Sequence, residues 1–223
     1  MLWSDVLQLT VFSAPQSDRS GFYETAKACD SSRPVTAALK RCATQNQARE
    51  SRYLHDGLLT MEAHYNVLFL CTGNSARSIM AEAILNHKGK PVFTAYSAGS
   101  HPSGTVHPEA LKQLELAGIS TIGLRSKSWD EFSRPGAPEM QFVFTVCDNA
   151  AKETCPVWPG HPMTAHWGVP DPVAVRGDSS EIERAFRQAF VILDRRISLF
   201  LALPLASIDR LALKKEVDRI GRQ

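Results

Sequence analysis

The sequence has no long apolar run and no concentration of charge of one sign. No apolar stretch approaches the ~18 residues that a membrane-spanning helix requires. The 25 Lys and Arg residues nearly balance the 23 Asp and Glu residues, and no basic run stands out. We therefore expect neither a membrane nor a nucleic acid as a partner.

Several nucleotide and hydrolase motifs are also missing. The sequence contains no Gly-x-x-x-x-Gly-Lys loop, no Gly-x-Gly-x-x-Gly fingerprint and no Gly-x-Ser-x-Gly turn, and we expect no tightly bound cofactor. The opening residues lack the basic segment and apolar core of a secretory signal, which predicts a cytoplasmic protein. In that compartment the five cysteines, at positions 29, 42, 71, 147 and 155, should be largely reduced.

The first 60 residues differ from the rest of the chain. Beyond a weakly apolar opening at residues 6–12 they show no sustained apolar period. This pattern predicts a poorly ordered N-terminal extension over residues 1–60. The alternative is that translation starts at Met61 and that the preceding residues are upstream sequence. In both cases residues 61–223 form the folded domain.

From residue 65 onward, strand patterns alternate with helix patterns. The predicted strands are 67–70, 92–97, 141–147 and 164–168, and the predicted helices are 78–86, 108–116, 181–203 and 207–220, with a helical turn at 129–132. The alternation predicts an α/β fold with a small parallel sheet of about four strands flanked by helices, and an extra C-terminal helix.

Residues 71–78, Cys-Thr-Gly-Asn-Ser-Ala-Arg-Ser, join the first predicted strand to the first predicted helix. The backbone N–H groups of such a loop can surround a tetrahedral anion, and the helix start adds donors and a positive dipole end. Gly73 and Asn74 tolerate the positive φ that a tight loop requires. We therefore predict an oxyanion-binding loop formed by Thr72, Gly73, Asn74, Ser75, Ala76, Arg77 and Ser78.

Cys71 is the candidate nucleophile of this loop. Its sulfur would lie under the bound anion, and Arg77 can hold two oxygens of that anion with its planar guanidinium. Ser78 can hydrogen-bond the sulfur. We expect these surroundings to lower the pKa of Cys71 below its free value of about 8.5. The plain alternative is a buried cysteine at a strand end, next to an unrelated arginine.

Further short motifs follow the loop in order along the chain. With the loop itself, the set comprises residues 71–78, 80–82, 97–99, 147–155 and 166–172. Together they resemble the low-molecular-weight protein-tyrosine-phosphatase superfamily, and specifically its arsenate reductase branch of the thioredoxin-coupled type. The resemblance implies a small parallel sheet flanked by helices.

The resemblance also implies roles for individual residues. Cys71 would be the nucleophile, Arg77 the oxyanion clamp, and Asp171 the general acid that protonates an oxygen leaving arsenic or phosphorus. Glu82 and Ser97 match positions that help to hold potassium in some members, which implies a weak potassium site. We expect no other metal.

Two more cysteines distinguish a reductase from a phosphatase. After Cys71 attacks arsenate, a second thiolate would attack its sulfur and release arsenite, and a third would move the disulfide outward for reduction by thioredoxin or glutathione/glutaredoxin. By resemblance, Cys147 and Cys155 fit these roles. Within a rigid helix their Cα atoms would lie about 12 Å apart, and a disulfide needs about 7 Å or less. We therefore expect residues 147–155 to unwind or loop.

The expected substrate is a small inorganic oxyanion, arsenate or phosphate. Val173 follows the Asp-Pro pair where phosphatases of this family commonly carry a tyrosine that flanks an aryl phosphate. We expect a monomer.

Three alternatives stay open. A phosphatase acting on phosphomonoesters needs only Cys71, Arg77 and Asp171. A non-enzymatic sensor could bind an oxyanion and form a disulfide between Cys71 and Cys147. A zinc site could be assembled from Cys147, Cys155, His161 and His166, but their spacing matches no standard pattern.

Overall fold

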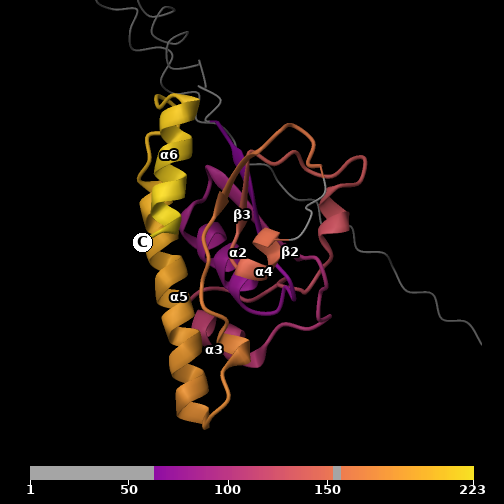
Figure 1. The fold of residues 1–223 in the computed structure, drawn as a ribbon, viewed down its shortest axis with the longest axis vertical. Helices are drawn as coiled ribbons and strands as arrows, with labels where there is room; N and C mark the ends of the chain where they lie inside the picture. Colours follow the sequence, from indigo (N-terminus) through magenta and orange to yellow (C-terminus); the bar gives the residue numbers. More distant parts are fainter. Residues whose placement is uncertain (1–62, 153–156) are drawn as a thin grey trace, which may run out of the picture. The chain divides into compact units, whose positions relative to one another are not determined.

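The chain is described from a computed structural model, which covers residues 63–152 and 157–223 (Figure 1). The predictions for residues 1–60, the Met61 start and Cys155 therefore lie outside the described residues. Within the described ranges, no helix combines the length and apolar character needed to cross a membrane.

Four parallel strands form one sheet in the described part of the chain. In the order in which they are hydrogen-bonded, they are β2 (Phe93–Gly99), β1 (Tyr65–Cys71), β3 (Phe142–Thr145) and β4 (Met163–His166). The central strand β1 is buried from Val67 to Cys71, which explains its continuous apolar sequence. Because all strands are parallel, their carboxyl ends meet at one edge, where Cys71 pairs with Gly99.

Helices cover the sheet. They are α2 (Arg77–Lys88), α3 (Pro108–Leu116), α4 (Asp148–Lys152), α5 (Ser179–Leu201) and α6 (Arg210–Gly221), with 3-10 helices at Trp129–Phe132 and Pro172–Ala174. Figure 1 shows α5 and α6 side by side along one side of the domain. The predicted α/β architecture with a C-terminal helix is confirmed.

The side chains of β1 divide between two hydrophobic clusters because successive residues of a strand face opposite sides of the sheet. Val67 and Phe69 join the larger cluster, which includes residues of α2, α5 and α6. Leu68 and Leu70 join a smaller cluster that includes Phe132 and Trp158.

Two helices begin at residues other than those predicted, because capping side chains determine where they start. Asp178 forms a capping box with Glu181, so α5 begins at Ser179 rather than at 181. Asp209 accepts hydrogen bonds from Leu211 and Ala212 N–H, so α6 begins at Arg210 rather than at 207. The long helix ends at Leu201 rather than at 203, because the residue before Pro204 is disfavoured in a helix.

The third predicted strand was too long. β3 ends at Thr145, so Cys147 lies beyond the strand, and the polar residues that follow it form the short helix α4. Residues 108–116 and 129–132 form helices with the predicted bounds.

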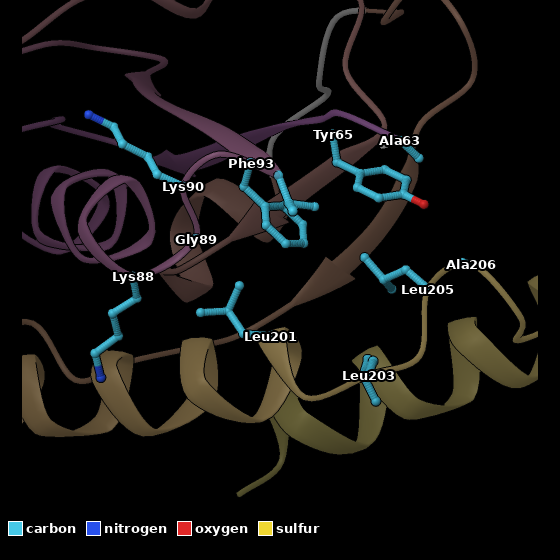
Figure 2. Close-up of a pocket in the computed structure, with 11 residues that line it drawn as sticks. Ala63, Tyr65, Lys88, Gly89, Lys90, Phe93, Leu201, Leu203, Leu205 and Ala206 are labelled. Carbon is cyan, nitrogen blue, oxygen red and sulfur yellow. The ribbon is translucent and has the colours of Figure 1, made fainter. Parts of the chain in front are cut away.

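A pocket of about 500 Å³ opens at the amino ends of β1 and β2. Figure 2 shows Tyr65 and Phe93 facing the apolar side chains of Leu201, Leu203 and Leu205 across it. Its lining contains no cysteine, histidine or acid. The pocket lies at the opposite edge of the sheet from Cys71, so we do not place the reactive site there.

Candidate active site

The loop after Cys71 connects the end of β1 to the start of α2. Four backbone hydrogen bonds tie its carbonyl groups to residues 100–107: Ser100 N–H to Cys71 O (3.3 Å), His101 N–H to Thr72 O (3.0 Å), Ser103 N–H to Gly73 O (2.9 Å) and His107 N–H to Ser75 O (2.9 Å). Carbonyl groups that are held outward in this way favour a nest of N–H groups on the inner side, as an anion site requires.

The neighbouring strand approaches this loop closely. A Cβ atom on Gly99 would lie 2.4 Å from Thr72 O and 3.0 Å from Asn74 Cβ, so any other residue at 99 would displace the loop. Asn74 itself adopts φ 42°, a conformation that asparagine tolerates better than most residues.

The Cys71 sulfur is almost fully buried, with 3% of the residue exposed. It lies 2.9 Å from Ser78 Oγ and accepts a hydrogen bond from Asn74 N–H at 3.1 Å. The Asn74 amide is buried beside it and donates to Ser78 Oγ and to Ser97 Oγ, both at 2.9 Å. The sulfur therefore sits in a network of polar groups that spans three elements.

Burial raises the pKa of Cys71 above its ordinary value, and the nearby Cys147 thiol adds to the increase. Hydrogen bonds from Ser78 and from Asn74 N–H lower the pKa, and Arg77 lowers it least. The predicted net decrease is therefore wrong. The reason is that desolvation of the thiolate outweighs the effect of the local hydrogen-bond donors. The positively charged neighbour, Arg77, forms its ion pair with Asp171 instead.

Arg77 is bound to the loop that carries Asp171. Its Nη2 atom lies 2.7 Å from Asp171 Oδ2, and its Nη1 atom donates to Val169 O at 3.1 Å. The other carboxylate oxygen, Asp171 Oδ1, accepts from Val173 N–H at 3.0 Å. The structure thus brings together Arg77, the predicted oxyanion clamp, and Asp171, the predicted general acid, as an ion pair.

Cys147 lies beside the loop although it is far away in the sequence. It is buried, and its sulfur is 3.6 Å from Thr72 Oγ1. Ala150 N–H, in the first turn of α4, donates to the same sulfur at 3.4 Å. A second thiol is therefore available at the rim of the loop. Cys155, its predicted partner, lies outside the described residues.

His166 holds α4 to the sheet. Its Nε2 atom lies 3.0 Å from Asp148 Oδ1, and its Nδ1 atom lies 2.9 Å from Thr145 Oγ1. Among residues 63–152 and 157–223, no group of three or more His, Cys, Asp and Glu side chains is arranged to hold a metal ion.

Sequence reasoning missed two buried cations near the site. Lys127 is 7% exposed, and its Nζ atom lies 3.1 Å from Glu82 Oε2 and 3.5 Å from Ser97 Oγ. These are the oxygens that the implied potassium ion would use, so the cluster does not fit potassium. Nothing in the sequence of this polar loop signalled the burial of Lys127.

The second missed cation is Arg196. It is 6% exposed and donates to Trp167 O and Gly168 O at 2.9 and 3.0 Å. It therefore holds the segment that leads to Asp171. The sequence did carry a signal for this burial: Arg196 lies three residues after Leu193, on the apolar stripe of α5.

Known proteins resemble this chain in sequence and in structure. An arsenate reductase from Shouchella clausii is 34% identical over 134 residues, which covers 60% of this chain and 93% of the relative. An arsenate reductase from Bacillus subtilis is 36% identical over 115 residues, covering 52% of this chain and 79% of the relative. A solved structure, of an arsenate reductase in its oxidized state, aligns with a TM-score of 0.51 and 25% identity over 61% of this chain and 96% of the other.

The family profile described as low molecular weight phosphotyrosine protein phosphatase matches residues 66–217, which include the loop, Cys147 and Asp171. The predicted resemblance is therefore confirmed, and this chain belongs to the low molecular weight phosphotyrosine protein phosphatase family.

Proposed function

We propose that this protein reduces arsenate to arsenite, with Cys71 as the nucleophile. The observation that carries the proposal is the second buried thiol, Cys147, at 3.6 Å from the loop residue Thr72. Hydrolysis of a phosphoester needs one thiol, whereas reduction of arsenic needs two electrons and hence two thiols. The arsenate reductases from S. clausii and B. subtilis support the same choice.

In the first step, the Cys71 sulfur attacks arsenic, and one oxygen leaves. Arsenate in the loop would compete with Asp171 for the Arg77 guanidinium, because a planar fork binds two oxygens of one anion. The displaced Asp171 carboxyl group could then take up a proton and deliver it to the leaving oxygen, which departs as water. Because burial raises the pKa of Cys71, the sulfur enters as a thiol and passes its proton to the bound arsenate.

In the second step, the Cys147 thiolate attacks the Cys71 sulfur. A sulfur–sulfur bond forms, the sulfur–arsenic bond breaks, and its electron pair stays on arsenic, which leaves as arsenite. Cys155 would then attack Cys147, restoring the Cys71 thiol and leaving a Cys147–Cys155 disulfide. Thioredoxin or a glutathione-linked glutaredoxin would reduce that disulfide, and arsenic detoxification is the biological role that follows.

The test is arsenate-dependent NADPH oxidation, coupled in parallel through thioredoxin with its reductase and through glutathione with glutaredoxin. We expect turnover with one donor system and its loss in the Cys147→Ser variant. Cys29→Ser, in the N-terminal part of the chain, is the matched control and should keep turnover. Equal turnover in Cys147→Ser and the unaltered protein would overturn the relay.

Phosphatase activity is the second candidate, because Cys71, Arg77 and Asp171 are sufficient for it and the family is named for it. Hydrolysis of an aryl phosphate measures it directly. Under this alternative, Cys147→Ser keeps full activity and Cys71→Ser loses it.

A further inference from the structure

A buried polar cluster lies beneath the oxyanion loop and consists of Asn74, Ser78, Glu82, Ser97 and Lys127. Asn74, Ser78 and Ser97 are fully buried, Lys127 is 7% exposed and Glu82 is 9% exposed. The cluster joins the loop, α2, β2 and the segment before Trp129, so it fixes these parts of the chain relative to one another.

Lys127 is the positive charge of this cluster. Its ammonium lies 3.1 and 3.5 Å from the two carboxylate oxygens of Glu82, 3.5 Å from Ser97 Oγ and 3.3 Å from Arg125 O. Without that ammonium, the buried Glu82 carboxylate would lose its ion-pair partner, which is strongly unfavourable.

Lys127 also fixes the orientation of Asn74. The Lys127 backbone N–H donates to Asn74 Oδ1 at 2.7 Å, so the Asn74 amide nitrogen must face the other way. Both of its hydrogens are then donated, one to Ser97 Oγ and one to Ser78 Oγ.

The donor and acceptor roles of these hydrogen bonds also determine which group donates to the Cys71 sulfur. Ser97 Oγ donates to the Glu82 carboxylate, and it accepts from Asn74 and from Lys127. Since Ser78 Oγ accepts from Asn74, its own hydrogen is free to be donated to Cys71 Sγ, 2.9 Å away. A donor at this place stabilises the negative charge that develops on the sulfur when it gives up its proton and attacks the oxyanion.

We infer that Lys127 is a positioning residue whose ammonium serves as the resident monovalent cation of the loop, so that the protein needs no added potassium. The inference builds on the proposed function, since it concerns the loop that binds the oxyanion. Removing the ammonium should leave the oxygens of Glu82 and Ser97 free to bind an external cation of similar charge and size.

The experiment measures binding of inorganic phosphate by calorimetry, in potassium chloride and in choline chloride at equal ionic strength. The unaltered protein should bind equally well in both salts. Lys127→Met should bind phosphate about tenfold more weakly in choline chloride, the scale of one lost charged hydrogen-bond partner, and potassium should restore most of the loss. Lys112→Met, which removes the ammonium of an exposed pair with Glu183 2.7 Å away, should change neither value.

The double variant Glu82→Gln/Lys127→Met removes the charge that would attract potassium. Its phosphate affinity should not respond to potassium, and neither should its Tm. If Lys127→Met is too unstable for calorimetry, its Tm should rise with potassium because a ligand that binds only the folded state stabilises that state.

Three results would overturn the inference: a potassium requirement in the unaltered protein, full phosphate affinity of Lys127→Met in choline chloride, or a potassium response that persists in the double variant. These readouts do not depend on arsenate turnover. If the unaltered protein binds phosphate but never reduces arsenate, the proposed function fails, while the potassium response still decides the role of Lys127.

Discussion

Arg77 and Asp171 form a salt bridge across the loop edge, with Arg77 Nη2 2.7 Å from Asp171 Oδ2. Arg77 is 13% exposed and Asp171 is 41% exposed at the side chain, so the pair is accessible to an incoming anion. The Asp171 carboxylate binds the Arg77 guanidinium, to which an oxyanion over Cys71 would also bind. Under the proposed function, binding of an oxyanion and release of Asp171 would therefore be coupled.

This coupling predicts opposite effects of Asp171→Asn on binding and on chemistry. Loss of the competing charge should tighten phosphate binding by up to about fivefold, since a partly exposed ion pair contributes at most ~1 kcal/mol. Loss of the acid should lower arsenate turnover about 10²- to 10⁴-fold. Calorimetry and steady-state kinetics measure the two effects. Weaker phosphate binding in Asp171→Asn would show that Asp171 does not compete with the anion.

The raised pKa of Cys71 predicts low thiol reactivity at neutral pH. Alkylation of Cys71 by iodoacetamide, followed by peptide mass spectrometry, should rise only above the ordinary thiol pKa of about 8.5. A rate that is already at its plateau at neutral pH would show that the pKa of Cys71 is not raised.

The same shift predicts how stability depends on pH. Because the thiol loses its proton less readily in the folded state, its contribution is fully present below the unfolded pKa of about 8.5 and is lost as pH rises towards the folded pKa. The free energy of unfolding should therefore fall more steeply in alkaline solution for the unaltered protein than for Cys71→Ser. Parallel curves for the two proteins would exclude the linkage.

Ser78→Ala removes the hydroxyl that lies 2.9 Å from the Cys71 sulfur. The pKa of Cys71 should rise further, because a donor that lowers it is lost. Turnover should fall about tenfold, the scale of one hydrogen bond to a charged group. The pH dependence of Cys71 alkylation separates this effect from a loss of folded protein. Ser198→Ala, on the exposed side of α5, serves as the control and should leave the pH profile unchanged.

The contact between His166 and Asp148 predicts an effect on the last step of the relay. We expect formation of a Cys147–Cys155 disulfide to unwind the start of α4, and the 3.0 Å contact between His166 Nε2 and Asp148 Oδ1 would oppose this unwinding. His166→Ala should therefore speed formation of that disulfide by up to about fivefold, the scale of an exposed pair. Acid quenching and mass spectrometry after one turnover would measure it. Thr164→Ala, an exposed neighbour on β4, should leave the rate unchanged.

The sequence predicted the parts of the molecule that depend on local pattern. The apolar run before Cys71 indicated a buried central strand, which the structure shows. The loop residue types indicated an anion site, which stays a prediction. The four strands and the main helices followed from periodicity. α4 was missed because its five residues are too few to show a helical period.

The remaining features depend on tertiary packing. The burial of Lys127 and Arg196 could not be read from residue type, since such residues are usually exposed. The pKa of Cys71 was predicted in the wrong direction because the donors are visible in the sequence, whereas the loss of solvent is not. The pairing of Arg77 with Asp171 likewise joins segments whose proximity only the fold creates.

Hydrogen bonds hold the carbonyl groups of residues 71, 72, 73 and 75 outward, so the proposed cradle inside the loop would select an anion by its shape and charge. Phosphate and arsenate have the same tetrahedral shape and nearly the same charge, so such a cradle admits both. Discrimination must then come after entry, when arsenic accepts an electron pair that phosphorus refuses. Where phosphate is abundant, phosphate would occupy the loop of most molecules. The rate of arsenate reduction would then depend on how fast phosphate dissociates.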